Sequence, residues 1–137
     1  MTKFMIDNIE LIQKSFLEKI KWNNDGLITV IAQEKNSKDI LMLAWMNQES
    51  LLQTISKGQA VYWSRSRQKL WHKGEESGHF QHVHDISLDC DGDAILLTIT
   101  QQCGIACHTG RHSCFFYSLE KDEHNQNNLV WKIESVI

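Results

Sequence analysis

Short runs of hydrophobic and β-branched residues alternate with polar, glycine-containing turns along most of the chain. Runs of about 4–8 such residues, bounded by turn formers, are typical of β-strands. The pattern predicts strands over residues 27–33, 40–45, 60–64, 81–88, 94–101, 114–119 and 129–133. The polar segment 120–128 separates the last two runs, so we expect them to form a hairpin around it.

Two segments have the spacing of helices instead. Residues 7–21 carry apolar residues three and four positions apart after Asp7, which predicts an amphipathic helix. Asn47 can cap a second, short helix that ends near Ser56, where a lysine and a glycine follow. Residues 65–78 are basic, contain glycine and show little periodicity, so we expect a loop. The predicted fold class is α+β, mainly antiparallel β-sheet with a few short helices.

Size and composition favour one soluble domain. A chain of 137 residues has room for one ordinary core, and 42% hydrophobic residues is typical of globular proteins. A net charge of −3 offers no general attraction to nucleic acid or membranes, so neither is expected as a partner. No segment has the apolar length of a membrane span or the pattern of a signal peptide. We therefore expect a cytoplasmic protein whose four cysteines are reduced, metal-bound or catalytic.

The first candidate for metal chemistry is an acidic run that contains Asp89, Asp91 and Asp93, with Cys90 inside it. If the segment is extended, the three carboxylates share one face and Cys90 points to the other. Close carboxylates repel one another unless a cation lies between them, and oxygen ligands suit magnesium. The alternative is an ordinary solvated acidic turn. A calcium loop of the EF-hand type does not fit, because its later glycine and glutamate are missing here.

The second candidate is a set of three thiols, Cys90, Cys107 and Cys114. Three thiolates on one zinc ion leave its fourth position free for water, as in catalytic rather than structural zinc sites. The six residues between Cys107 and Cys114 include Gly110, so the chain can turn back on a metal. The alternative is three small buried hydrophobic residues, since free cysteines are often buried. Cys103 would close the site as a fourth ligand and make it structural.

Three thiolates outweigh the two positive charges of zinc, so such a metal is a weaker Lewis acid than zinc held by neutral imidazoles. A nearby base or cation would be needed to help. His108 directly follows Cys107 and is our candidate for general base or proton shuttle. A cluster of His79, His82 and His84 is another possible metal site, although surface or substrate-contact roles are commoner for such residues.

A basic segment over residues 64–75 stands out in this acidic chain. Arg65, Arg67 and Lys73 could bind phosphate there, and the tryptophans between them could stack on a base. The alternative is a solvated loop whose aromatic side chains enter the core.

Five motifs in a fixed order are more specific than any of these features alone. They are LMLAWMN at 41–47, YWSRSR at 62–67, LWHKGE at 70–75, DCDGD at 89–93 and ACHTG at 106–110. Together they resemble phosphoribosyl-AMP cyclohydrolase, the family that performs the third step of histidine biosynthesis. The resemblance covers roughly residues 26–118. The single domain of residues 1–137 accordingly divides into an N-terminal helix (1–22), the motif-bearing core (26–118) and a C-terminal hairpin (119–137).

The resemblance implies two metal sites and a homodimer. The implied zinc ligands are Cys90, Cys107 and Cys114. The implied magnesium ligands are Asp89, Asp91 and Asp93. The subunits would interlock, with one zinc ion per subunit and each zinc site shared between the two chains. Weaker expectations place Arg65, Arg67, Lys73 and Arg111 on the two phosphates of the substrate.

The implied substrate is the nucleotide 1-(5-phosphoribosyl)-AMP, in which substitution at N1 makes adenine C6 electrophilic. Zinc-activated water would attack C6 and the N1–C6 bond would break, with His108 transferring protons; the enzyme is then a metal-dependent hydrolase of a cyclic amidine. Zinc deaminases attack the same carbon, but their signature contains proline, which this chain lacks. Two alternatives remain: a structural zinc module that binds RNA, with Cys103 as fourth ligand, and a zinc hydrolase of another purine nucleotide.

Overall fold

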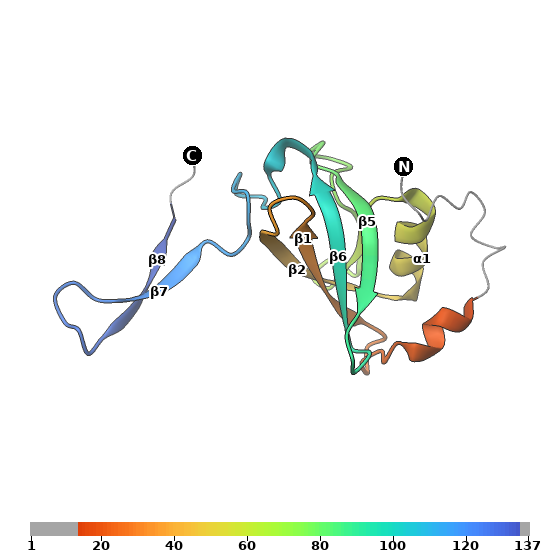
Figure 1. The fold of residues 1–137 in the computed structure, drawn as a ribbon, viewed down its shortest axis with the longest axis horizontal. Coiled ribbons are helices and arrows are strands. Elements are labelled where there is room, and N and C mark those ends of the chain that lie inside the picture. The colour runs from red at the N-terminus through yellow and green to blue at the C-terminus, as the bar shows by residue number, and fades with distance from the viewer. Residues whose placement is uncertain (1–13, 135–137) are drawn as a thin grey trace.

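The computed structural model describes residues 14–134, and its body is a four-stranded sheet in the order β2-β1-β6-β5 (Figure 1). The strands are β1 (Ile28–Glu34), β2 (Ile40–Met46), β5 (Gln81–Leu88) and β6 (Ala94–Gln101). Within the sheet, β1 pairs with β2 and β5 with β6 in antiparallel fashion, which confirms the expectation of a mainly antiparallel sheet. Strands β1 and β6 run parallel, and the long connection that this pairing requires contains β2, helix α1, a second hairpin and β5.

A small second sheet corrects one expectation. The segment 65–78, which we expected to be a loop, contains strand β4 (Lys69–His72), paired antiparallel with β3 (Val61–Ser64). Strand β4 is short, and its residues alternate between exposed and half-buried positions. Four residues are too few for period-two alternation to stand out against the basic composition of the segment.

Helix α1 (Gln48–Lys57) confirms the predicted short helix and its caps. The side-chain oxygen of Asn47 accepts a hydrogen bond from Ser50 N–H at 2.8 Å, and Ser50 Oγ accepts one from Asn47 N–H at 2.8 Å. This reciprocal pair is a capping box. Gly58 ends the helix in the left-handed conformation, with φ of 68°.

The predicted N-terminal helix over residues 7–21 is only partly within the described chain, because residues 7–13 lie outside it. Lys14–Lys19 form a short 3-10 helix, η2, rather than a stretch of α-helix. The helix does not reach its predicted end because Lys21 N–H donates to the carbonyl oxygen of Gly92 at 2.8 Å. This bond redirects the chain along the turn between β5 and β6.

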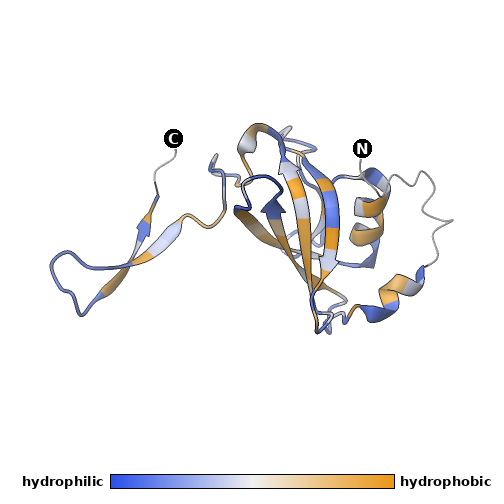
Figure 2. Ribbon diagram, in the orientation of Figure 1, coloured by the Kyte–Doolittle hydropathy of each residue, from blue (hydrophilic) through white to orange (hydrophobic). Residues whose placement is uncertain are grey.

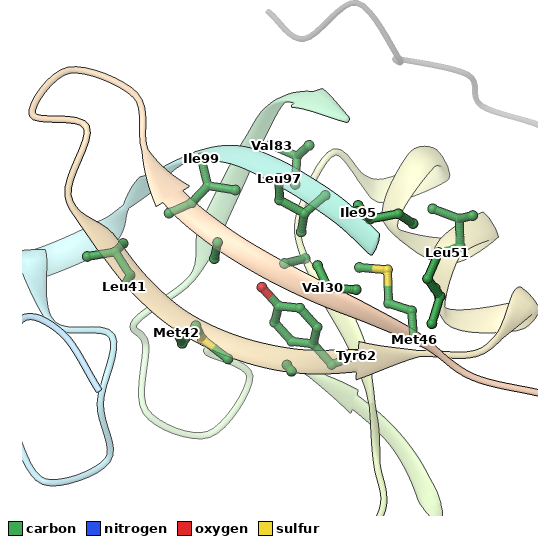
Figure 3. Packing of buried hydrophobic residues seen from close by; sticks show 14 of the residues in the cluster. Val30, Leu41, Met42, Met46, Leu51, Tyr62, Val83, Ile95, Leu97 and Ile99 are labelled. Carbon is green, nitrogen blue, oxygen red and sulfur yellow. The ribbon is translucent and has the colours of Figure 1, made fainter. Parts of the chain in front are cut away.

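The hydrophobic core is built from the four strands of the main sheet together with α1 and β3. Every second residue of β6 is buried, as the period of a strand requires. Figure 2 shows apolar positions on the strands and on α1, and Figure 3 shows how their side chains converge. The largest side chains that are almost fully buried include Tyr62, Ile28, Leu41, Met46, Leu51, Leu97 and Ile99.

A buried polar network ties the β3–β4 hairpin to the main sheet. The hydroxyl of Tyr62 donates to Gln81 Oε1 at 2.6 Å, and Gln81 Nε2 donates to Gln101 Oε1 at 2.9 Å. Gln101 Nε2 in turn donates to the backbone oxygen of His79 at 3.0 Å. Tyr62, Gln81 and Gln101 are at most 5% exposed, so these bonds replace water for groups that would otherwise be unsatisfied.

The C-terminal hairpin of β7 (Tyr117–Lys121) and β8 (Leu129–Ile133) extends away from the body of the molecule (Figure 1). Strand β7 begins later than residue 114, the predicted start. The reason is that Cys114 N–H donates to the carbonyl oxygen of Leu41 at 2.7 Å, which holds this part of the chain against β2. All residues of β7 are exposed in the single chain.

We expect Tyr62→Phe to lower the free energy of unfolding by about 1–3 kcal/mol, because it leaves Gln81 Oε1 buried without its donor. Denaturant unfolding followed by tryptophan fluorescence measures the change. Ser15→Ala is the control: it also removes a hydroxyl, but from an exposed residue of η2 outside the hairpin, and should change stability by less than about 0.5 kcal/mol. Equal effects of the two variants would contradict the role of the network.

Candidate functional site

A pocket of about 700 Å³ lies between the β3–β4 hairpin with its following turn and the loop of residues 106–114. The two segments are far apart in sequence, and the sheet brings them together. Side chains of several chemical kinds line the pocket, including Met42, Arg67, Lys69, Trp71, Lys73, His79, Cys107, His108 and Cys114. This mixture of apolar, basic and sulfur groups in one concave site is typical of a ligand-binding pocket.

The loop 106–114 folds back on itself and brings two of the predicted zinc ligands together. Cys107 N–H donates to the carbonyl oxygen of Arg111 at 3.1 Å, and Gly110 N–H donates to the carbonyl oxygen of Cys107 at 3.0 Å. Gly110 has φ of 88°, which favours glycine at this turn. Cys107 and Cys114 both line the pocket, and they are close enough that each shifts the pKa of the other.

The two thiols of this pair differ in acidity. Burial raises the pKa of Cys107, but hydrogen bonds from the Thr109 hydroxyl, at 3.1 Å from Cys107 Sγ, and from the Thr109 backbone outweigh it, so the pKa is lowered. Burial and the neighbouring Cys107 thiolate raise the pKa of Cys114 to about 11. Cys107 therefore loses its proton more readily than Cys114, and a metal cation bound by both sulfurs would displace the thiol protons.

Cys90, the third predicted ligand, is exposed in the turn between β5 and β6. Strand β6 runs from this turn towards the loop that holds Cys107 and Cys114, and its eight residues span about 23 Å at the usual rise per residue. The structure thus brings two of the three thiols together within one chain and leaves Cys90 at the opposite end of a strand.

Cys103 does not join the thiol pair. It is exposed, in the short 3-10 helix η3 (Gln102–Gly104), where it adopts φ of 64°. Within residues 14–134, no set of three close metal-binding side chains includes any of the cysteines. A closed four-thiolate site, as the RNA-binding alternative requires, is therefore not formed by the described part of one chain.

The three predicted magnesium ligands do lie together. One carboxylate oxygen from each of Asp89, Asp91 and Asp93 lies within 4.8 Å of the others, and all three residues are exposed. The expected geometry, an extended strand with alternating faces, is wrong: residues 89–93 form a turn in which Gly92 has φ of 76°. The carboxylates converge because the backbone curls around them.

Charges and hydrogen bonds within the turn give its carboxylates different pKa values. Desolvation raises the pKa of Asp89, but hydrogen bonds donated by the backbone of Asp93, at 3.0 Å, by the Asp93 side chain and by the backbone of Ala94 outweigh it, and the pKa is lowered. The hydrogen bond between the two side chains, together with the negative charge of Asp89, raises the pKa of Asp93. Such repulsion is what a bound cation relieves.

The N-terminal segment fixes the position of this acidic turn. The carbonyl oxygen of Gly92 accepts the bond from Lys21, and a Cβ atom at position 92 would lie only 2.5 Å from the carbonyl oxygen of Lys19. Position 92 therefore requires glycine for two reasons, the left-handed backbone and the close approach of another segment.

Of the predicted histidines, His108 and His79 line the pocket. His108 is exposed and directly follows the buried Cys107, so it can reach solvent and ligand. His82 Nε2 lies 3.1 Å from Gln102 Oε1, and His84 Nε2 lies 2.7 Å from Thr100 Oγ1. The structure does not gather His79, His82 and His84 into a metal-binding group.

The four basic residues expected at phosphates have different surroundings. Arg67 lines the pocket and is exposed. Arg65 lies over the ring of Trp45, 4.6 Å from its centre, and Arg111 lies over the ring of Phe116, at 4.1 Å. The fourth, Lys73, also lines the pocket but is buried, with only 7% of its surface exposed.

Two features of the site were not predicted from the sequence. The first is the burial of Lys73, which a basic, glycine-containing segment gave no reason to expect. The second is the buried network of Gln81 and Gln101. It contacts the pocket through Met42, whose sulfur accepts a hydrogen bond from Gln81 Nε2. The sequence did contain a signal for the buried glutamines. Side chains alternate between the two faces of a strand, so Gln81 lies on the same face as Val83, which is buried.

Comparison with known proteins gives a consistent family. The family model described as phosphoribosyl-AMP cyclohydrolase matches residues 42–116, which include the pocket, the acidic turn and both paired cysteines. The phosphoribosyl-AMP cyclohydrolase of Herminiimonas arsenicoxydans is 62% identical over 107 residues, covering 78% of this chain and 80% of the relative. That of Methylobacillus flagellatus is 63% identical over 108 residues, covering 79% and 83%.

A third relative, from Cupriavidus taiwanensis, bears the same name and is 60% identical over 109 residues, covering 80% of this chain and 81% of the relative. The matches therefore cover about four fifths of this chain and of each relative. Apart from Leu41, the first residue of LMLAWMN, the motifs that suggested this resemblance lie inside residues 42–116. The chain belongs to the phosphoribosyl-AMP cyclohydrolase family, which consists of hydrolases in histidine biosynthesis.

Proposed function

We propose that the protein opens the adenine ring of 1-(5-phosphoribosyl)-AMP by zinc-assisted hydrolysis, as a homodimer whose active sites are each shared by two chains. The positions of the cysteines are the observation that supports a site shared by two chains. Cys107 and Cys114 meet at the pocket, whereas Cys90 lies at the far end of β6. A second copy can supply the missing thiol if its acidic turn lies against the first pocket.

The donor set fits zinc. Thiolates are soft ligands that zinc prefers, and Cys107 and Cys114 line the same pocket, with the pKa of Cys107 already lowered. We infer that Cys107 and Cys114 of one chain and Cys90 of the second hold the metal. When bound, zinc supplies a Lewis acid that makes a water molecule more acidic.

The chain's own residues then handle the proton and the nucleotide. Water adds to C6, the N1–C6 bond breaks and C6 becomes a carboxamide carbon. One proton of the water goes to N1 and the other to the exocyclic nitrogen, so one water is consumed and no other group is released. His108, at the pocket mouth beside Cys107, takes the proton from water and returns it to N1. The ring of Trp71, 38% exposed at the same pocket, can stack on the purine, and Arg67 can bind a phosphate.

Asp89, Asp91 and Asp93 fit a magnesium ion, because three exposed carboxylates within 4.8 Å form an all-oxygen site of the kind that this cation binds. Magnesium there would supply positive charge for a substrate phosphate. If Cys90 of one chain reaches the pocket of the other, the acidic turn lies at that pocket too, because Cys90 is part of the turn of residues 89–93. The second chain would then bring a thiol and a phosphate-binding cation to the pocket together.

An independent feature supports a second copy. The hairpin of β7 and β8 has an apolar face that contacts water in the single chain. Its cross-strand pairs are Tyr117 with Ile133 and Leu119 with Trp131, and these four side chains are 51–65% exposed. A projecting strip of aromatic and aliphatic side chains is unusual on a monomer and typical of an interface. We infer that this hairpin packs on the partner chain, as an interlocked dimer requires.

We also infer a cytoplasmic location. The four cysteines are free thiols, which a reducing compartment maintains. No helix within the described residues has the length and apolar character needed to cross a membrane.

The shared site predicts complementation between two inactive variants. Cys90→Ser and Cys107→Ser should each lack activity alone. When equal amounts are co-expressed or refolded together, half of the dimers are mixed, and each mixed dimer rebuilds one of its two sites. We therefore expect about a quarter of wild-type activity in an absorbance assay of ring opening.

The matched control combines Cys107→Ser with Cys114→Ser. Both changes lie in the same half of the site, so every site in the mixed dimer stays damaged and no activity should return. Zinc content measured on the same samples shows whether activity follows the metal. If the Cys90→Ser and Cys107→Ser mixture is as inactive as this control, the three thiols do not meet across two chains.

His108→Ala should keep bound zinc and reduce turnover by about 10²–10⁴-fold, the usual contribution of a general acid–base group. His124→Ala, in the turn between β7 and β8, is the control and should leave turnover unchanged. The two measurements are metal content and steady-state kinetics. Near-normal turnover of His108→Ala with full zinc would remove His108 from the proton transfer.

A further inference from the structure

Lys73 is a buried cation beside the paired thiols. Its side chain is 7% exposed, and Nζ donates to the carbonyl oxygen of Ala106 at 2.6 Å, one residue before Cys107. Nζ also lies 5.2 Å from the centre of the Trp71 ring. The backbone next to Lys73 is closely packed: a Cβ atom on the following residue, Gly74, would lie 2.4 Å from the backbone of Phe80.

A buried ammonium group is costly unless an opposite charge lies nearby. Within residues 14–134, the ion pairs are His112 with Asp39 and Lys132 with Glu123, so no described carboxylate is paired with Lys73. The groups near it that become negative when they lose a proton are the two cysteines: Lys73 lines the same pocket as Cys107 and Cys114, and its Nζ bonds to the residue before Cys107. Burial lowers the pKa of Lys73, and negative charge on Cys114 and Cys107 opposes the lowering.

The proposed zinc site needs such a cation. Three thiolates and one zinc ion leave a net negative charge, which weakens the metal as a Lewis acid and is unfavourable in a partly buried pocket. One adjacent ammonium group cancels this excess. The Ala106 carbonyl that Lys73 holds also belongs to the loop that presents Cys107, so the same side chain restrains the loop.

We propose that Lys73 is a positioning residue for the metal centre, which fixes the thiol loop through Ala106 and balances the charge of the thiolates. This inference rests on the zinc site proposed above. It replaces the expectation that Lys73 binds a substrate phosphate, because its Nζ is buried and already donates to a backbone carbonyl. Arg67, exposed at the same pocket, remains free for the phosphate role.

The test separates charge from hydrogen bonding. Lys73→Gln keeps a donor for the Ala106 carbonyl but removes the charge, whereas Lys73→Arg keeps the charge. Zinc affinity is measured on the full-length protein by competition with a chromophoric chelator. We expect Lys73→Gln to bind zinc about 10–100-fold more weakly, the usual effect of losing a group that supports metal ligands. Lys73→Arg should stay near the wild-type affinity.

Lys69→Gln is the matched control, because Lys69 is an exposed lysine of β4 that lines the same pocket. Its zinc affinity should equal that of the wild type. Kinetics with 1-(5-phosphoribosyl)-AMP at saturating zinc add a second readout: loss of charge at Lys73 should lower kcat and leave KM nearly unchanged. A phosphate-binding lysine gives the reverse, a raised KM with unchanged zinc affinity, and that result overturns the proposal.

The remaining outcomes are also decisive. If wild-type protein binds no zinc, the proposed metal centre and the role of Lys73 fail together. If wild-type protein binds zinc and Lys73→Gln binds it equally well, only the role of Lys73 fails. Should Lys73→Gln not fold, as judged by circular dichroism, Lys73→Arg decides: zinc affinity near the wild-type value supports charge balance, and a large loss overturns it.

Discussion

The length of β6 is the constraint on which the chemistry of this protein depends. The strand lies in the middle of the sheet, pairing with β1 on one side and β5 on the other, so it can neither bend sharply nor slide. The acidic turn with Cys90 precedes it and the paired thiols follow it. A fixed strand of about 23 Å keeps these groups apart within one chain. Two chains side by side are the simplest way to unite them.

Charge is the second organising theme. The pocket wall gathers two thiols and one buried ammonium group, and the acidic turn gathers three carboxylates. Within each cluster the pKa values differ: burial and the neighbouring Cys107 raise the pKa of Cys114, and the hydrogen bond with Asp89 and its negative charge raise that of Asp93. Both clusters become favourable when a cation of the right kind is bound. Groups that become negative when they lose a proton thus gather at the two places where metal chemistry is proposed.

Period-two patterns and turn residues were sufficient to predict most of the fold. The strands now called β5 and β6 were predicted with the bounds observed, and the capped helix was predicted from Asn47 and Gly58. Strand β4 was missed because four residues carry too little pattern. The carboxylates of the site were grouped correctly but for the wrong reason, since a turn rather than a strand gathers them. The burial of Lys73 could not be predicted, because it depends on the distant backbone of Ala106.

The exposed hairpin of β7 and β8 begins only three residues after Cys114, so the apolar interface and the thiol pair are parts of one continuous segment. If the partner chain both covers this hairpin and completes the zinc ligands, metal loading and subunit assembly are thermodynamically linked. Zinc then tightens the dimer by the same factor by which dimerisation tightens zinc. A newly made single chain would bind zinc weakly, and the first effect of a low zinc concentration would be dissociation of the subunits.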